Sequence, residues 1–213
     1  LAPELGEGFG AWSMRQAAVR LAALLGLAAI DNQDRVGLIA GGERVQRFVL
    51  PQKGGGHVLR CLRDCTELPL GRADGRAMLL ARATERVRRR ALVFVFSGLA
   101  EPALERPLRA CARRHDTVWL RPVPRESFDP PPCLLHARAA GSDRPLRIDL
   151  GDARVRADWL AQQEARAALH RDVLGRAGVD AVDCPVPATP DVEALARPLL
   201  RYVRRRAGLR GGR

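Results

Sequence analysis

Aromatic residues are scarce in this sequence and make up only 4% of its 213 residues. A hydrophobic core must therefore be built mainly from Leu, Val and Ala, and the apolar content of 46% is high enough to exclude a globally disordered chain. No apolar run approaches the roughly 20 residues that a membrane-spanning helix requires. No basic start followed by an apolar stretch indicates a signal peptide. We therefore expect a cytoplasmic protein, and the start at Leu1 leaves open what stands upstream.

Lysine is almost absent: Lys53 is the single lysine among 36 basic residues, and the formal net charge is +12. One interpretation is phosphate binding on nucleic acid. The other is the Arg-rich, Ala-rich composition typical of a GC-rich genome. We favour the second, because the arginines are spread along the chain and lack aromatic stacking partners. The denser clusters are Arg86, Arg88, Arg89 and Arg90, and then Arg201, Arg204, Arg205 and Arg206, which we predict to be a solvated tail after the last helix.

The five cysteines are an odd number, which suits a reducing compartment better than a disulfide scaffold. Cys61 and Cys65 share a face of a predicted helix, and His57 lies one turn earlier. A zinc site would need a fourth ligand of suitable geometry, and the sequence offers none. We therefore predict buried thiols and no metal.

Apolar periodicity divides the chain into alternating helices and strands. The predicted helices cover 14–30, which Ser13 caps, then 57–67, 75–88, 101–114 and 153–177, and a last helix follows the cap and first-turn proline of Thr189-Pro190. The predicted strands cover 35–40, 44–50, 91–96, 117–123 and 179–185, and 133–139 and 145–150 are read as a minor hairpin or edge strands. The segments 51–56 and 124–132 are predicted loops, and Pro198 is a candidate kink in the last helix.

The order of these elements predicts one α/β domain with a mostly parallel sheet and helices on both faces. The run at 91–96 is apolar throughout, which is typical of a strand covered on both faces. We expect 35–40, 91–96, 117–123 and 179–184 to be parallel in one central sheet, with 44–50 antiparallel at one edge.

Three segments carry a family resemblance: "DNQDRVGLIAGGERVQRFVLPQKGGGHVLRCL", "RRRALVFVFSGL" and "RRHDTVWLRPVPRES". Together they resemble the domain-of-unknown-function 58 (DUF58) family, and the likeness runs from about Phe9 to Arg206. The resemblance implies a von Willebrand factor A-like (Rossmann-like) three-layer sandwich, forming a single domain over residues 1–213. It also implies a partnership with MoxR-type AAA+ ATPases.

In that fold class the carboxyl edge of the sheet usually holds a metal-ion-dependent adhesion site, whose oxygen ligands suit Mg²⁺. The resemblance places residues of this chain at the ligand positions, where Ser97, Asp74 and Glu126 remain as oxygen donors and Glu4 or Glu7 could supply a further carboxylate. The positions are Ala2, Glu4 and Gly6 for the first motif, Ala73 and Asp74 for the threonine loop, Ser97 and Gly98 after the 91–96 strand, and Glu126 in the turn Val123-Pro124-Arg125-Glu126. We therefore expect a degenerate site without metal.

The sequence shows no catalytic triad and no paired carboxylates in a credible cleft, which speaks against a hydrolase. His115-Asp116 is read as a turn entering a strand rather than as a base and its orienting group. We predict a non-enzymatic protein-interaction domain without a cofactor, whose partner is a MoxR-type AAA+ ATPase or its client. The alternative is a basic nucleic-acid-binding domain. The predicted contact residues are Arg72, Arg76, Glu101, Arg125, Glu126 and Phe128, with recognition through arginine forks.

Overall fold

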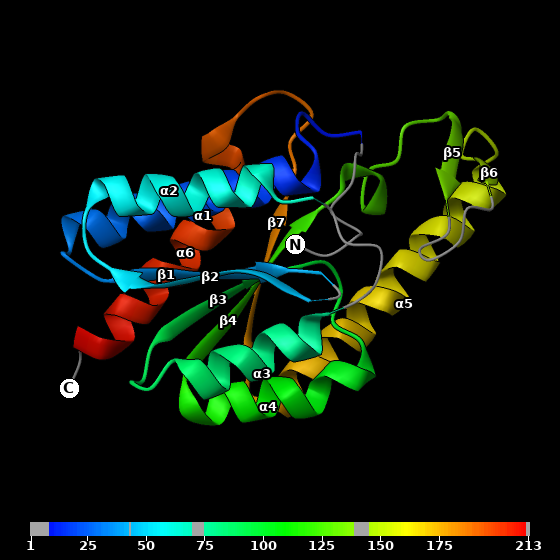
Figure 1. Cartoon of the computed structure of the whole chain (residues 1–213). Coiled ribbons are helices and arrows are strands. Elements are labelled where there is room, and N and C mark those ends of the chain that lie inside the picture. The colour runs from blue at the N-terminus through cyan, green and yellow to red at the C-terminus, as the bar shows by residue number, and fades with distance from the viewer. Residues whose placement is uncertain (1–8, 43, 70–74, 139–144, 212–213) are drawn as a thin grey trace.

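The computed structural model describes residues 9–42, 44–69, 75–138 and 145–211. Helices and strands alternate along most of the chain (Figure 1). The helices are α1 (Met14–Asp31), α2 (Gly55–Glu67), α3 (Arg76–Arg86), α4 (Glu105–Arg114), α5 (Ala153–Ala177) and α6 (Val192–Gly211). The strands are β1 (Val36–Gly41), β2 (Val45–Gln52), β3 (Leu92–Phe96), β4 (Asp116–Val123), β5 (Leu134–Arg138), β6 (Pro145–Asp149) and β7 (Asp180–Pro185). The predicted α/β class is confirmed.

A parallel sheet with the strand order β3–β4–β7 is the centre of the molecule. β4 lies in the middle of this sheet, and Val118, Trp119 and Leu120 on it are completely buried. Such a strand has no solvated face, which is why the three residues at its middle, Val118, Trp119 and Leu120, are apolar.

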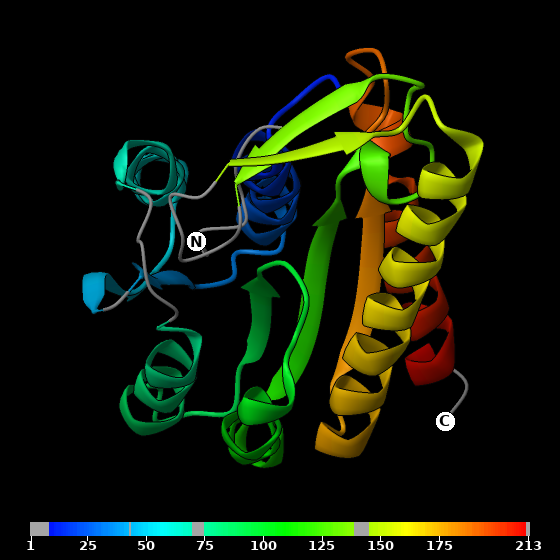
Figure 2. The same ribbon diagram turned by 90° about the vertical axis from the view of Figure 1, so that its right-hand side faces the viewer.

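Helices cover both faces of the sheet, so that the fold has three layers (Figure 2). One hydrophobic cluster joins Val118 and Leu120 to residues of α1 and α6, among them Leu21 and Leu195. A second cluster joins Trp119 to residues of α3, α4 and α5. Alternate residues of β4 thus point into two separate cores, as the period of a strand requires.

The prediction of one continuous sheet was wrong. β1 pairs with β2 in an antiparallel hairpin, and among the described residues neither strand pairs with β3. The hairpin runs across the direction of the three parallel strands (Figures 1 and 2). The register of β1 and β2 shifts between Val36 and Leu38 and again between Ala40 and Gly41. Apolar runs indicate that strands are covered, but they do not specify which strands are neighbours.

β5 and β6 form the predicted minor hairpin, in which Leu134 is opposite Asp149. The loop between β4 and β5 contains the single-turn helix η2 (Arg125–Ser127). The segment before α4 begins as another such turn, η1 (Pro102–Leu104), so the predicted helix over 101–114 has two parts.

Side-chain caps define where several helices begin. Ser13 and Gln16 form a capping box at α1, as expected from a Ser in that position. Asp152 caps α5 through the backbone N–H groups of Arg154 and Val155. The last helix was assigned the wrong cap, because Asp191 rather than Thr189-Pro190 accepts the N–H of Ala194.

α2 begins at Gly55, within the segment predicted as a loop. Gly54 precedes it with φ of 101°, a conformation that favours glycine. No helix among the described residues combines the length and apolar character needed to cross a membrane.

Arg201, Arg204 and Arg205 are exposed as predicted, but they belong to α6, which continues to Gly211, and not to a tail after it. Arg206 lies on the helix face toward the sheet, where it pairs with Asp116 and, at 3.2 Å, with Asp180. The Tyr202 hydroxyl donates to the same Asp180 carboxylate at 2.7 Å and accepts from Arg206. This network fastens the carboxyl-terminal part of α6 to the amino ends of β4 and β7.

We predict that Arg206→Ala lowers the free energy of unfolding by about 1–2 kcal/mol, because two carboxylates lose a charged hydrogen-bond donor. Urea denaturation monitored by circular dichroism measures the change. The control is Arg204→Ala, since Arg204 is exposed in the same helix and should cost less than about 0.5 kcal/mol. Equal losses for the two variants would show that Arg206 does not fasten the helix.

Candidate functional site

The chain leaves the carboxyl end of β3 through the loop 97–101. In open α/β sheets this is the edge where ligands bind. Ser97 is 2% exposed, and its N–H donates to the carbonyl of Leu120 at 3.3 Å. Its hydroxyl has no hydrogen-bond partner within the described residues. The serine thus closes the strand ladder rather than presenting its hydroxyl to solvent.

Two buried rings hold the next part of this loop. The indole N–H of Trp119 donates to the carbonyl of Gly98 at 2.9 Å. Nδ1 of His170, on α5, accepts the N–H of Ala100 at 2.8 Å. The two rings meet edge to face with their centres 5.8 Å apart. The loop is therefore fixed from the central strand and from α5.

His170 is a neutral, structural histidine. Burial, together with the positive charge of Arg121, lowers its pKa to about 4. Because Nδ1 accepts a hydrogen bond, the proton is on Nε2, which is buried and has no partner among the described residues. A ring so placed cannot act as a base toward Ser97 without first giving up its bond to Ala100.

Arg76 brings a positive charge to the same loop. It is 7% exposed and donates to the carbonyl of Leu99 and, at 3.3 Å, to the carboxylate of Glu101. A guanidinium in this position repels a cation and pairs with the carboxylate of Glu101. The electrostatics of the loop thus oppose a Mg²⁺ site.

The loop after β4 forms the second part of this edge. The Glu126 carboxylate accepts the N–H of Phe9 at 3.2 Å. The backbone carbonyl of Glu126 accepts the indole N–H of Trp159 at 2.7 Å. Arg125 pairs with Asp129 within the loop. Phe128 is 48% exposed and Phe9 is 41% exposed. Two exposed phenylalanines therefore come from segments that a hydrogen bond joins.

The predicted site residues fall into two groups at this edge. The structure brings Ser97, Gly98, Glu101 and Arg76 together after β3, and it places Arg125, Glu126 and Phe128 after β4. The remaining predicted positions lie outside the described residues; they are Ala2, Glu4, Gly6, Arg72, Ala73 and Asp74.

Sequence reasoning missed His170 and the role of Trp119. His170 comes 70 residues after Ala100, on a helix that the sequence does not connect with this loop. An isolated histidine in a helical pattern carries no local signal of such a contact. Phe9 was named only as the start of the family resemblance, and its exposure was not predicted.

Metal ligation has little support among the described residues, since none of their His, Cys, Asp and Glu side chains form a group of three that could hold an ion. The Cys61 thiol and Nε2 of His57 are 3.8 Å apart, but that ring nitrogen also lies 2.9 Å from the Val36 carbonyl. Burial raises the pKa of Cys65 to about 11 and that of Cys184 to about 12. These thiols therefore stay protonated at neutral pH when no metal is bound.

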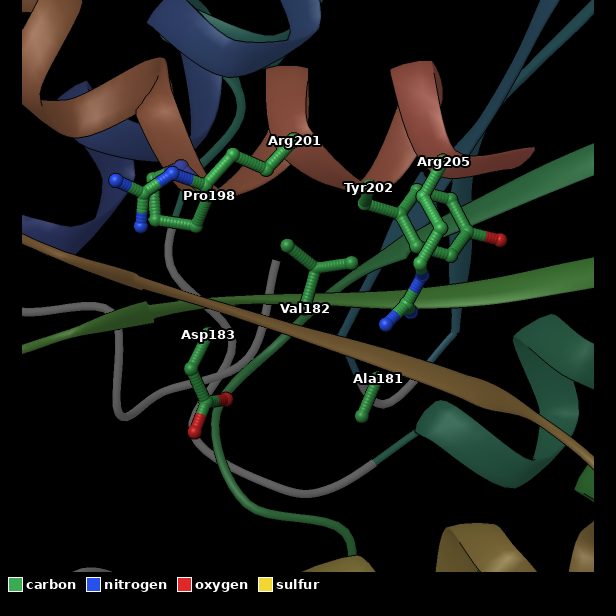
Figure 3. Close-up of a pocket in the computed structure, with 7 residues that line it drawn as sticks. All are labelled: Ala181, Val182, Asp183, Pro198, Arg201, Tyr202 and Arg205. Carbon is green, nitrogen blue, oxygen red and sulfur yellow. The ribbon is translucent and has the colours of Figure 1, made fainter. Parts of the chain in front are cut away.

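A pocket of about 330 Å³ lies between β7 and α6, away from the carboxyl-edge loops (Figure 3). Its lining residues are Ala181, Val182, Asp183, Pro198, Arg201, Tyr202 and Arg205. Val182 points toward the helix and Asp183 points away from it (Figure 3). The Asp183 carboxylate accepts from Nε of Arg121 at 2.8 Å, so its charge is already paired. These seven residues contain no nucleophile beside a base.

The exposed arginines occupy several surfaces. Arg86, Arg88, Arg89 and Arg90 are exposed before β3, at the amino edge of the sheet. Arg114 joins them there by donating to the carbonyls of Val87 and Arg88. Other exposed arginines lie on α5 and α6. The charge is therefore not confined to one face, although this amino-edge cluster is dense.

The chain matches a model of a protein family. The family model described as "Protein of unknown function DUF58" matches residues 6–169, which is more than half of the chain. A search of curated proteins finds no match.

The low pKa of His170 makes stability depend on pH. As the pH falls below the ordinary value of 6.5, the unfolded chain takes up a proton, while the folded chain resists until about pH 4. Neutral His170 therefore makes its full contribution to the free energy of unfolding above pH 6.5, and this contribution is lost as the pH falls toward about 4. We expect His170→Gln to show a smaller loss of unfolding free energy between about pH 7.5 and about pH 5 than the parent chain.

The measurement is urea denaturation at the two pH values. The control is His136→Gln, since His136 is exposed and should leave the pH difference unchanged. His115 is also buried with a lowered pKa, so His170→Gln should remove only part of the acid sensitivity. An unchanged pH difference in His170→Gln would contradict the assignment.

We also predict that millimolar Mg²⁺ leaves the melting temperature unchanged, because Arg76 is beside the loop and engages Glu101. Any ligand that binds only the folded state would raise the melting temperature by mass action. A saturable rise with Mg²⁺ or Mn²⁺, observed by differential scanning fluorimetry with Ca²⁺ as a comparison, would restore a metal-dependent mechanism.

Proposed function

The chain belongs to the DUF58 family, and from this premise we propose that it is a non-enzymatic protein-interaction domain. In this proposal it is an accessory partner of a MoxR-type AAA+ ATPase or of the client of that ATPase. The domain has a von Willebrand factor A-like fold whose adhesion site has lost its metal, and its carboxyl-edge loops bind the partner directly.

The observation that carries the proposal is the pair of exposed phenylalanines at the carboxyl edge. Phe9 and Phe128 expose nearly half of their surface, and the bond between Phe9 and Glu126 holds their segments together. Aromatic side chains are enriched in protein interfaces, where a few large anchors supply most of the binding energy. With so few aromatic residues in the chain, two exposed rings at one edge favour a binding surface.

The loops that would form this surface are already ordered by internal hydrogen bonds. Trp119 and His170 hold the loop after β3, and Trp159 holds the loop after β4. A preorganised surface loses little conformational entropy when it binds. This rigidity suits recognition by shape in place of recognition through a bridging metal ion.

The exposed charges at this edge differ from those we expected. The guanidinium groups of Arg76 and Arg125 form ion pairs with Glu101 and Asp129. They are therefore less available to bind an acidic partner. The carboxylate side chains of Glu101 and Asp129 are 66% and 61% exposed. A complementary partner surface would therefore have an apolar pocket with a basic rim.

The three-layer arrangement is consistent with a von Willebrand factor A-like fold, although the parallel sheet has only the strands β3, β4 and β7. The non-enzymatic part of the proposal is supported by the state of the two groups nearest to the edge. The Ser97 hydroxyl is buried without a partner, and His170 is neutral and bound to the backbone. Neither arrangement activates a nucleophile.

We predict that Phe9→Ser combined with Phe128→Ser weakens capture of the MoxR-type ATPase from the same organism by about tenfold or more, as expected for loss of aromatic anchors. Surface plasmon resonance with the full chain measures the affinity. The matched control combines Phe48→Ser with Leu50→Ser, which replaces exposed apolar residues of β2 and should leave the affinity unchanged. Equal binding by both double variants would refute the loop interface.

Nucleic-acid binding is the second candidate, and the amino-edge cluster of exposed arginines favours it. Replacing Arg88, Arg89 and Arg90 by Ser tests it, because these side chains lie at the opposite edge from Phe128. If the arginine variant lost binding to DNA or RNA at physiological salt, and the parent chain bound no ATPase, nucleic-acid binding would become the leading function.

A further inference from the structure

The pocket between β7 and α6 is large enough for a small molecule. Its volume of about 330 Å³ falls in the range of roughly 300–1,000 Å³ that ligand pockets occupy. On the helix side Arg201, Tyr202 and Arg205 line it together with Pro198, which they follow by three, four and seven residues. Residues with this spacing share one face of a helix, so a single stripe of α6 borders the pocket.

Part of the pocket lining is apolar. Val182 points toward α6, is 5% exposed and belongs to the hydrophobic cluster that joins the sheet to α1 and α6 (Figure 3). Ala181 precedes it on β7, and Pro198 contributes from the helix. Because a proline has no backbone N–H, Pro198 adds an apolar ring and no donor. An apolar part of a ligand would therefore be removed from water in this pocket.

Two polar side chains of the lining are already hydrogen-bonded within the fold. Both carboxylate oxygens of Asp183 accept from Arg121, one of them at 2.8 Å. The Tyr202 hydroxyl donates to Asp180 at 2.7 Å and accepts from Arg206. These bonds fix the walls of the pocket, and fixed walls lose little conformational entropy when a ligand binds.

Arg201 and Arg205 bring positive charge to the pocket. Both are exposed, and neither guanidinium forms an ion pair or a hydrogen bond with another residue in the described part of the chain. In this they differ from Arg206 of the same helix, which pairs with Asp116 and Asp180. The Arg205 side chain extends from α6 toward β7 (Figure 3). The pocket thus combines an apolar surface with two cationic groups.

We propose that this pocket binds a small organic anion, in which a phosphate or carboxylate group is attached to an apolar body. Charge complementarity assigns the acidic group to Arg201 and Arg205, because a planar guanidinium binds phosphate and carboxylate oxygens through two parallel hydrogen bonds. The apolar body would contact Val182 and Pro198. This inference does not rest on the proposed function, since the pocket and the carboxyl-edge loops share no residue.

The lining favours a small molecule over a nucleic acid. Nucleic acids gain most of their nonspecific affinity from phosphate contacts with a row of cationic groups. Here two arginines border a hollow whose other residues are apolar or already hydrogen-bonded. A phosphate backbone would gain nothing from Val182 or Pro198, whereas an organic anion would bury its apolar body there. A requirement for that body therefore separates the two kinds of ligand.

Phenyl phosphate is the probe, because it carries both features. Inorganic phosphate lacks the apolar body, and benzyl alcohol lacks the charge. Each compound is titrated into the full chain at constant ionic strength and followed through its amide shifts by NMR. We expect phenyl phosphate to bind with a dissociation constant of about 1 mM or tighter, which suits so small a ligand. The other two compounds should bind at least about tenfold more weakly.

The amide shifts also locate the ligand. Phenyl phosphate should shift the amides of Ala181, Val182 and Tyr202 in a saturable manner, while those of Leu99 and Phe128 at the carboxyl edge stay unchanged. Loss of ATPase capture in the phenylalanine variants would leave these shifts intact. The proposed function and this inference therefore fail separately.

A matched pair of double variants tests the charge. Arg201→Gln combined with Arg205→Gln should weaken the binding of phenyl phosphate by at least about tenfold. Arg197→Gln combined with Arg204→Gln removes the same charge from exposed positions of α6 that do not line the pocket, so it should leave the affinity nearly unchanged.

A second pair tests the apolar surface. Ala181→Asp places a carboxylate in the pocket, where it should weaken the binding of phenyl phosphate by at least about tenfold through repulsion. Ala168→Asp adds the same group to an exposed position of α5 and serves as the control. Circular dichroism shows that each variant keeps its fold.

Four outcomes would overturn the inference. The first is the absence of any saturable shift with millimolar phenyl phosphate. The second is equally tight binding of inorganic phosphate, which would show that charge alone attracts the probe. The third is a set of shifts centred on Arg88, Arg89 and Arg90, which would identify a general polyanion surface and favour nucleic acid. The fourth is an equal loss of affinity in the two double arginine variants.

Discussion

The arrangement of the carboxyl edge depends on the hydrogen bond from the Trp119 indole to the Gly98 carbonyl, 2.9 Å long. Trp119 is fully buried on the central strand, so this bond ties the end of β3 to the most rigid part of the molecule. The same ring orients His170, which in turn holds Ala100. A polar indole group buried in a core must find an acceptor, and here the acceptor is the loop itself. The requirement to satisfy one buried N–H thus helps to determine the shape of the loop after β3.

Arginine has a structural role in this chain that its net charge conceals. Arg76, Arg121 and Arg206 each direct a guanidinium to carboxylates or carbonyls of another element. The planar fork of arginine makes several such bonds at once, which the single ammonium of lysine does not. Part of the basic composition therefore stabilises the fold, although these ion pairs leave the net charge of +12 unchanged, because that value already counts every carboxylate.

Local patterns predicted most of the elements, and the contacts between elements were much harder to infer. The periodicity of 14–30 and the cap at Ser13 identified α1 correctly, because both signals lie within a few residues. The separation of β1 from β3 could not be inferred, since strand pairing depends on distant packing. Arg206 was misjudged for the same reason: its partner Asp116 is 90 residues away. The same contrast holds for the candidate site. Local sequence predicted the loops after β3 and β4, whereas the distant contact from His170 to Ala100 was missed.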